Sequence, residues 1–427
     1  MHDDADLDDH NGATPSAAAP PDAAATADAV AAAGSRGPLG ALRVLDLSQG
    51  IAGPSCGGLF AEYGADVIKI EPVGGDWVRA LGTRIDGSSA QAITYNRAKR
   101  SLALDLKHAS ATPIVLKLAE RADVVIQNAR PGAMTRLGLD FDAVRARNPR
   151  IVYVSISGYG QQGPNAPLAM VDTVGQAQSG LMSVALGRDG MPTKLNVTLI
   201  DHVTGLYGFQ AAMMALWTPK AEREAQHLDI SLMQSAAMMM APYILEWSAV
   251  GHAPGLFNAP AGNYATADGY FAVTLVTDAH FKAIAEAIGQ PALASDERFA
   301  TFPARKAHAD AICAILRDAM ATDTTASWVN RFAAASALGS QINTYGDWLA
   351  DPHVQVVKAA PAYPLSDGGN VSLPHTPGAP AFNAAAPAVG EHSRAILSEA
   401  GLSDAAVEAL VAEGAVVCAQ DAREAAE

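Results

Sequence analysis

The sequence predicts an α/β protein built on a mostly parallel β-sheet. Short apolar runs alternate with helical patterns through the first half of the chain, and this order is typical of a parallel sheet with helices on both faces. The 427 residues suffice for two or three domains. A stretch rich in Gly, Pro, Ala and Asn over 251–269 precedes a second set of strands and helices. We therefore expect a large α/β domain and a smaller second domain.

The elements are expected in the following order. Residues 1–36 are mostly Ala, Asp and Pro, and they lack the large apolar side chains that could offset the entropy of ordering, so we expect disorder there. After Gly37, apolar and β-branched runs predict strands, and apolar residues at helical spacing predict helices. The predicted strands are 43–47, 66–70, 123–127, 150–156, 195–200, 227–230 and 270–275. The predicted helices are 55–63, 109–121, 173–184, 201–217, a long helix ending near 249, 280–288, 304–320, 325–335 and one or two within 388–413.

Changes in composition divide the chain into five predicted segments. These are an acidic, Ala-rich tail over 1–36, the N-terminal part of the large domain over 37–220, a linking strand and helix over 221–250, the small domain over 251–345, and a linker with the C-terminal part of the large domain over 346–427.

The composition excludes several classes of protein. The net charge of −15 argues against a nucleic-acid-binding surface. Three distant cysteines, Cys56, Cys313 and Cys418, fit a reduced cytoplasmic protein. The acidic N-terminus does not resemble a secretory signal, and Pro242 and Glu246 interrupt the most apolar stretch, so no membrane span is expected. No HExxH motif or paired cysteine spacing occurs, so we expect no metal site.

Asp201 is the residue around which the functional prediction is built. It is the only charged side chain between Lys194 and Lys220. The predicted strand before it would deliver it to the carboxyl edge of a sheet, where ligands bind in open α/β folds. Two roles are open, and they are not exclusive. The carboxylate could cap a helix N-terminus, or it could act as a nucleophile held at that position.

Two short motifs have the residue spacing of known sites, but the residues around them do not fit the structure that each site requires. Gly158–Gly163 has the spacing of a dinucleotide-binding loop, but Pro164 and Pro167 prevent a helix from opening there. Gly53–Gly57 has the spacing of a nucleophile elbow, but its serine does not directly follow a strand. The latter segment is better suited to offering backbone N–H groups to a carbonyl or phosphate ligand.

Basic residues recur before the middle of the chain. They are either solvated surface charges or a cluster beside a loop edge that binds a phosphorylated ligand. They are Lys69, Arg79, Arg97, Lys99, Arg100, Lys107, Arg130 and Arg136.

Taken in order, a series of motifs from about Gly37 to Ala415 resembles the class III coenzyme A transferases, the CaiB/BaiF family. The motifs are Gly53-Pro54, Gly64–Pro72 followed by Gly75-Asp76, Lys99–Lys107, Asn128–Gly132, Leu137–Leu139, Ser155–Gly160, Gln176–Gly180, Asp201 with Thr204-Gly205, and Pro387–His392.

The resemblance implies a Rossmann-like large domain whose sheet is formed from both chain ends, a smaller middle α+β domain, and an interlocked homodimer. It implies an enzyme that moves coenzyme A from an acyl-CoA donor to a free carboxylic acid through an aspartyl anhydride and an aspartyl-CoA thioester. Coenzyme A would be a substrate, with no tightly bound cofactor. By motif, Asp201 takes the catalytic position, and Asp172 takes that of an acidic residue near the reacting acyl group. The positions that contact coenzyme A fall on Ile51, Ala52, Leu104, Lys107, Asn128, Ala129 and Arg136.

The chain also departs from the family pattern. Some transferases have a glutamine at the position of Ile51 and a basic residue at Pro72 or Ala169. The glycine-rich lid of formyl-CoA transferases is reduced to Ala259–Asn263, which disfavours a formate or oxalate specialist.

Two alternative functions stay open. A 2-methylacyl-CoA racemase shares the fold, but racemising relatives carry a histidine where Val171 stands. A catalytically silent acyl-CoA-binding protein is the other alternative, and the retained Asp201 argues against it.

Overall fold

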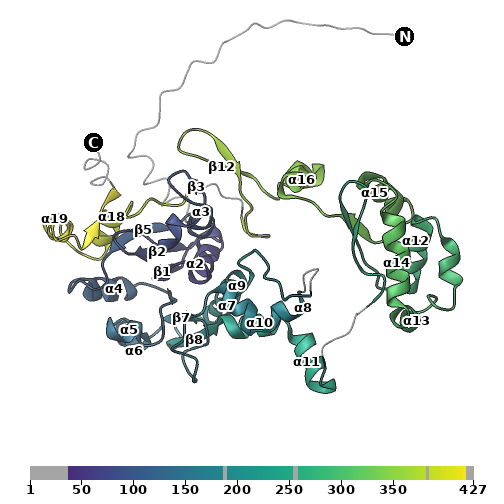
Figure 1. Cartoon of the computed structure of the whole chain (residues 1–427). Coiled ribbons are helices and arrows are strands. Elements are labelled where there is room, and N and C mark those ends of the chain that lie inside the picture. The colour runs from purple at the N-terminus through teal and green to yellow at the C-terminus, as the bar shows by residue number, and fades with distance from the viewer. Residues whose placement is uncertain (1–36, 186–189, 253–257, 381–383, 420–427) are drawn as a thin grey trace, which may run out of the picture. The chain divides into compact units, whose positions relative to one another are not determined.

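A computed structural model describes residues 37–185, 190–252, 258–380 and 384–419 (Figure 1). The disorder predicted for residues 1–36 lies outside these ranges. The chain divides into two compact units. Unit 1 consists of Met1–Ser157, Thr204–Ile230 and Gly378–Glu427, and unit 2 of Gly158–Val203 and Ser231–Pro377. The five-segment division expected from the composition stays a prediction.

Unit 1 is built on a seven-stranded sheet with the order β14-β5-β2-β1-β6-β7-β8. β1 pairs in parallel with β2 and β6, β2 with β5, and β6 with β7. The short β14 pairs antiparallel with β5. The strands are β1 Arg43–Asp46, β2 Asp66–Glu71, β5 Arg100–Leu104, β6 Val124–Gln127, β7 Val152–Ser157, β8 Gln226–Ser231 and β14 Val416–Val417. The prediction of a mixed α/β fold with a mostly parallel sheet is confirmed.

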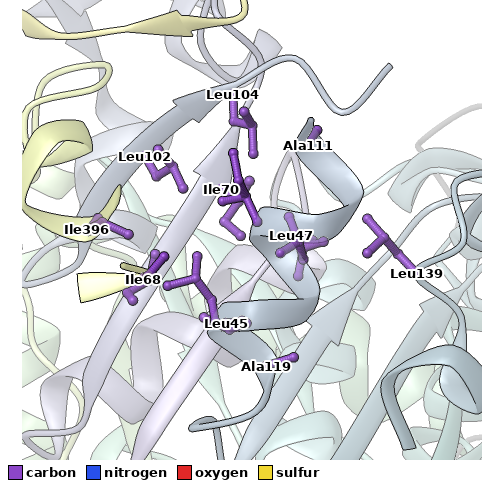
Figure 2. Close-up of a cluster of buried hydrophobic side chains, with 14 of the residues drawn as sticks. Leu45, Leu47, Ile68, Ile70, Leu102, Leu104, Ala111, Ala119, Leu139 and Ile396 are labelled. Atoms are coloured by element: carbon purple, nitrogen blue, oxygen red, sulfur yellow. The ribbon is translucent and has the colours of Figure 1, made fainter. Parts of the chain in front are cut away.

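Strands β1, β2 and β6 are buried on both faces, as the strands of a parallel sheet covered by helices are, whereas β8 at the edge of the sheet alternates partly buried and exposed residues. Figure 2 shows one face of the sheet, where Leu45 and Ile68 pack with Ile396 from the C-terminal helix α18. Both ends of the chain therefore build this core. The helices that lie wholly within unit 1 are α2 Ala52–Glu62, α3 Ala90–Asn96, α4 Ala111–Ala119, α5 Ala133–Arg136, α6 Phe141–Arg147, α18 Ser393–Glu399 and α19 Asp404–Ala412, with the 3-10 helix η1 Trp77–Ala80 and the hairpin β3 Arg84–Ile85 and β4 Ser88–Ser89.

Unit 2 contains a three-stranded antiparallel sheet, β11-β10-β9, packed on helices through a second core. Phe271, Phe281 and Trp328 are almost fully buried in this core, whose residues all lie within the segment 251–345 that is predicted to form the small domain. Its elements are β9 Gly262–Ala265, β10 Tyr270–Val273, α12 Asp278–Ala287, η2 Pro291–Ser295, α13 Phe302–Ala307, α14 Ala309–Met320, α15 Thr325–Ala334 and β11 Gly339–Gln341. Unit 2 also contains α7 Asp172–Gln178, α8 Leu181–Val184, α10 Leu232–Met239, α11 Ala241–Val250, α16 Tyr345–Ala350, α17 Pro352–Val356, β12 Ala362–Pro364 and β13 Asn370–Ser372.

The structure corrects the prediction around Asp201. Residues 195–198 form no strand, and helix α9 spans Leu199–Leu216, beginning two residues earlier than expected. The predicted long helix ending near 249 is two helices, which meet at Met240. Pro242 lies in the first turn of α11, where its missing N–H costs no helical hydrogen bond.

Within the described ranges, no helix is both long and apolar enough to cross a bilayer. The same residues bring together no group of three His, Cys, Asp or Glu side chains that could hold a metal ion.

Candidate active site

A topological switch point lies at the centre of the parallel sheet. β2 and β5 lie on one side of β1, whereas β6 and β7 lie on the other. The loops that leave the carboxyl ends of β1 and β6 therefore run in opposite directions, and such a switch point is where open α/β sheets bind ligands.

Asn128 ties these two loops together. Its Oδ1 accepts a hydrogen bond from the backbone N–H of Gln49 at 2.8 Å, and its Nδ2 donates to the carbonyl of the same residue at 2.6 Å. At Gly53, a Cβ would lie 2.2 Å from the Cβ of Ser48, so only glycine fits there. The pair Ile51 and Ala52 at the start of α2 is thus brought beside the Asn128 loop.

The remaining predicted coenzyme positions are more dispersed. Ala129 follows Asn128, and its N–H donates to the Gln127 Oε1 at 2.7 Å. Leu104 is buried in the core at the end of β5, which leaves mainly its backbone for a ligand. Lys107, after β5, and Arg136, at the end of α5, are exposed.

Lys99 is a buried cation that fixes the start of α2. Its Nζ donates to Asp46 Oδ2 at 2.7 Å, to the carbonyl of Pro54 at 2.8 Å and to Asn96 Oδ1 at 3.0 Å. Burial lowers the pKa of Lys99 to about 8, against the opposing effect of the Asp46 charge. Because Asp46 ends β1 and Pro54 lies in the first turn of α2, this one ammonium group joins the strand to the helix.

Lys69 holds the other side of the same loop. Its Nζ donates to the carbonyl of Ser48 at 2.7 Å and to Asp76 Oδ2 at 2.9 Å. Asp76 in turn accepts the N–H of Gly50 at 3.0 Å. Gly50 has a φ of +79°, and a Cβ there would lie 2.6 Å from the ring of Trp77. The loop between β1 and α2 is therefore held from both sides by buried charges.

These contacts correct the interpretation of the basic residues. Lys69 and Lys99 are neither solvated nor available to a phosphate, because both are fully buried in ion pairs. Three arginines are also paired: Arg79 with Glu71, Arg97 with Glu62, and Arg100 with Asp66. Lys107, Arg130 and Arg136 remain as exposed cations from the predicted set. The sequence signal for the buried pairs is that Lys69 and Glu71 interrupt an apolar strand.

The start of helix α9 is capped by Asp172, not by Asp201. The Oδ2 of Asp172 accepts the N–H groups of Ile200 at 2.7 Å and Asp201 at 3.3 Å. Asp201 is the third residue of the helix, and its side chain is partly buried. Burial, followed by the nearby charge of Asp172, raises the pKa of Asp201 to about 7. This carboxylate is thus unusually basic.

Helix α9 packs closely on the start of α2. A Cβ at Gly205 would lie 1.8 Å from Ser55 Oγ and 2.9 Å from the carbonyl of Ala52. Ser55 Oγ donates to that same carbonyl at 2.9 Å and is buried, so it is not presented on a nucleophile elbow. Asp201 precedes Gly205 by one helical turn on the same helix.

The loop Gly158–Gly163 also departs from its motif. β7 ends at Ser157, and the next helix begins only at Asp172. A dinucleotide-binding loop opens a helix directly, so this segment does not form one.

Comparisons with known proteins agree on one family. The model of CoA-transferase family III matches residues 39–393. The succinate–glutarate CoA-transferase of Agrobacterium fabrum is 34% identical, over 85% of this chain and 95% of that protein. The acetyl-CoA:oxalate CoA-transferase of Acetobacter aceti is 35% identical, over 69% of this chain and 78% of that protein.

A crystal structure supports the same relationship. A CAIB/BAIF family protein from Brucella suis superposes with a TM-score of 0.76 at 31% identity, covering 85% of this chain and 99% of that one. The expected family, the mixed α/β fold and the assignment as a transferase are thereby confirmed. The chain belongs to CoA-transferase family III, the CaiB/BaiF family, and its reaction is the transfer of coenzyme A.

Proposed function

We propose that this enzyme transfers coenzyme A between carboxylic acids through covalent intermediates on Asp201. The observation that carries the proposal is the carboxylate itself. It lies in the first turn of α9, and its pKa of about 7 marks it as a stronger base than an ordinary aspartate. A carboxylate suits this reaction because its anhydride keeps the acyl group activated, whereas a serine ester would lose that activation.

The proposed reaction conserves every group. An Asp201 oxygen attacks the thioester carbonyl of the donor, the C–S bond breaks, and coenzyme A leaves as a thiolate while a mixed anhydride forms. The thiolate then attacks the aspartyl carbonyl of this anhydride, which releases the donor acid and leaves an aspartyl-CoA thioester. The acceptor carboxylate repeats the two steps in reverse. The final attack gives the new acyl-CoA and returns the Asp201 carboxylate.

The raised pKa of Asp201 affects two quantities in opposite directions. A more basic carboxylate is a better nucleophile, but only its ionised form attacks. The pKa of about 7 therefore places the group half-ionised near neutral pH. Partial burial also limits the access of water, which would hydrolyse an anhydride.

Coenzyme A binding is assigned to the loops at the switch point. We place the pantetheine and nucleotide near Ile51, Ala52, Asn128 and Ala129, where backbone groups at the start of α2 can meet ligand oxygens. Leu104 would contribute its backbone. Lys107 and Arg136 are exposed cations in the loop after β5 and at the end of α5, and they would meet the phosphates.

Asp172 and the wider setting complete the proposal. Asp172 lies next to Asp201 through its bond to the Asp201 N–H, which supports a position near the reacting acyl group. We also propose a homodimer, no tightly bound cofactor and a cytoplasmic location. The location fits the three cysteines, none of which forms a disulfide bond within the described residues.

We further propose a short dicarboxylic acid as acceptor or donor. The similar proteins named above are a succinate–glutarate and an acetyl-CoA:oxalate CoA-transferase, and a third, from Chloroflexus aurantiacus, is the beta subunit of a succinyl-CoA–L-malate CoA-transferase at 32% identity. The short Ala259–Asn263 segment argues against oxalate as a substrate, but the similarity to an oxalate CoA-transferase is a reason to test oxalate as well. Racemisation is less well supported, because Val171 cannot exchange a proton.

A panel of acids tests this function. Succinyl-CoA is supplied as donor with glutarate, L-malate, oxalate or butyrate as acceptor, and the acyl-CoA products are identified by mass spectrometry. We expect transfer to at least one dicarboxylate, parallel double-reciprocal plots, and loss of transfer in Asp201→Asn. The matched control is Glu222→Gln, which changes an exposed carboxylate and should leave transfer intact. Full activity in Asp201→Asn, or deuterium at C2 of an acyl-CoA recovered from heavy water, would overturn the proposal.

A further inference from the structure

Gln176 is a completely buried polar side chain on helix α7, and all its polar atoms have partners. Its relative exposure is 0%. Its Oε1 accepts the N–H of Leu195 at 3.0 Å, and its Nε2 lies 3.1 Å from the carbonyl of Leu195 and 3.2 Å from that of Val197. The fourth contact joins Nε2 to Asp172 Oδ1 at 2.6 Å.

The orientation of this amide is fixed by its surroundings. Its oxygen faces one donor, and its nitrogen faces three acceptors. An amide rotated by 180° would therefore place donor against donor and acceptor against acceptor at every contact. With Leu195 it forms a two-point pairing that imitates the pairing of two backbone strands. Three backbone groups of segment 195–197 are therefore bonded to this one side chain rather than to a neighbouring strand.

The same amide reaches the start of α9 through Asp172. Residues 172 and 176 lie one turn apart on α7, so their side chains share a face. One carboxylate oxygen of Asp172 accepts from Gln176, and the other accepts from the N–H groups of Ile200 and Asp201. A Cβ at Gly175 would lie 3.3 Å from the Ile200 side chain. Helix α7 thus holds both the segment that enters α9 and the first turn of α9.

We propose that Gln176 is a positioning residue for Asp201. Together with Asp172 it fixes the first turn of α9 and thereby the orientation of the Asp201 carboxylate. This inference rests on the proposed role of Asp201. Gln176 is not a catalytic residue, because its amide is fully used by protein groups. Its effect is on the rate of attack rather than on the affinity for coenzyme A, since the coenzyme loops lie at the ends of β1 and β6.

The first test replaces the amide by an apolar side chain of similar size. In Gln176→Leu we expect kcat to fall about 100-fold, because a displacement of about 1 Å at the reacting atoms has an effect of that order. KM for the acyl-CoA and the Kd of free coenzyme A should stay within about threefold of wild type. The matched control, Thr173→Val, changes an exposed threonine on the same helix and should keep kcat within about twofold. Wild-type kcat in Gln176→Leu would overturn the inference.

A conservative variant separates positioning from general damage. In Gln176→Glu, a protonated carboxyl can still donate to Asp172 and accept from Leu195, whereas an ionised one faces Asp172 and two carbonyl oxygens. The ratio of wild-type to variant kcat should therefore increase as the pH rises from 6 to 8.5. A ratio that does not change with pH would contradict the inference. This variant also provides the test should Gln176→Leu not fold.

The inference and the proposed function fail in different ways. If Asp201→Asn transfers coenzyme A normally, the proposed function fails whatever Gln176 does. If Asp201→Asn is inactive while Gln176→Leu has wild-type kcat, only the positioning role fails.

Discussion

The most informative stability experiment replaces Asp201 by asparagine. In the folded protein, burial and the charge of Asp172 raise the pKa of Asp201 to about 7 from an ordinary value of 3.8. The folded protein therefore binds this proton more tightly than the unfolded chain does. The resulting stability is fully present at pH below 4 and is lost as the pH rises through 7. Asparagine cannot ionise, so the variant avoids this loss.

The magnitude follows from the two pKa values. Each pH unit between them changes the free energy of unfolding by about 1.4 kcal/mol, so ionised Asp201 destabilises the folded protein by about 4 kcal/mol near pH 8. The side chain is only partly buried, and solvent screening reduces the expected effect to about 1–3 kcal/mol. At pH 4.5 to 5 the two proteins should differ by less than about 1.5 kcal/mol, because only about one of the roughly three pH units between the unfolded and folded pKa values of Asp201 has then been crossed.

The assay is thermal unfolding of both proteins between pH 4.5 and 8.5. We expect the Tm of Asp201→Asn to exceed that of wild type by about 2–5 °C at pH 8, and by clearly less at pH 5. Glu222→Gln, the exposed control, should follow wild type at every pH. A difference in Tm that is constant with pH, or that grows as the pH falls, would refute the reasoning about Asp201.

Three further predictions use the same geometry. The acid limb of kcat/KM should have an apparent pKa of about 7, because Asp201 must be ionised to attack; a limb near pH 4 would contradict this. Lys99→Met should destabilise unit 1 by about 3–5 kcal/mol, since it leaves Asp46 buried without its cation, and the double variant with Asp46→Asn should lose less than the sum of the singles in urea unfolding. Gly205→Ala should lower the Tm and reduce transfer at least 10-fold, because the added methyl meets Ser55 Oγ and the Ala52 carbonyl. Adding Ser55→Ala should restore part of the Tm, and an unchanged Tm in Gly205→Ala alone would disprove the close packing.

Much of the fold could be predicted because several of the buried parallel strands consist mainly of apolar, β-branched residues. Strands such as Val124–Gln127 are buried on both faces, so hydrophobicity alone marks them. The segment from Leu195 to Ile200 is similarly rich in apolar residues, but residues 195–198 form no strand. The backbone of Leu195 pairs with the Gln176 side chain instead of with a neighbouring strand. A distant side chain that satisfies the backbone leaves no periodic signal in the sequence.

The site could be predicted less completely, because the partners of its buried charged side chains are not evident from the sequence. Motif resemblance marked Asp201 and Asp172 for functional roles, but sequence patterns could not tell which of the two caps α9, since both lie at predicted helix starts. Lys69 and Lys99 were expected at a surface or beside a phosphate. Their actual partners, Asp76 and Asp46, are distant in sequence or lie on other elements, so only tertiary structure reveals the pairing.

The most direct measurement of the central claim is chemical trapping of the intermediate on Asp201. Enzyme incubated with acyl-CoA is treated with hydroxylamine, digested and mapped by mass spectrometry. An aspartyl thioester or anhydride predicts conversion of Asp201 to its hydroxamate in wild-type and Glu222→Gln enzyme with acyl-CoA, and no hydroxamate in either enzyme treated without donor. An unmodified Asp201 in enzyme that is turning over, or a hydroxamate on another residue, would contradict the account.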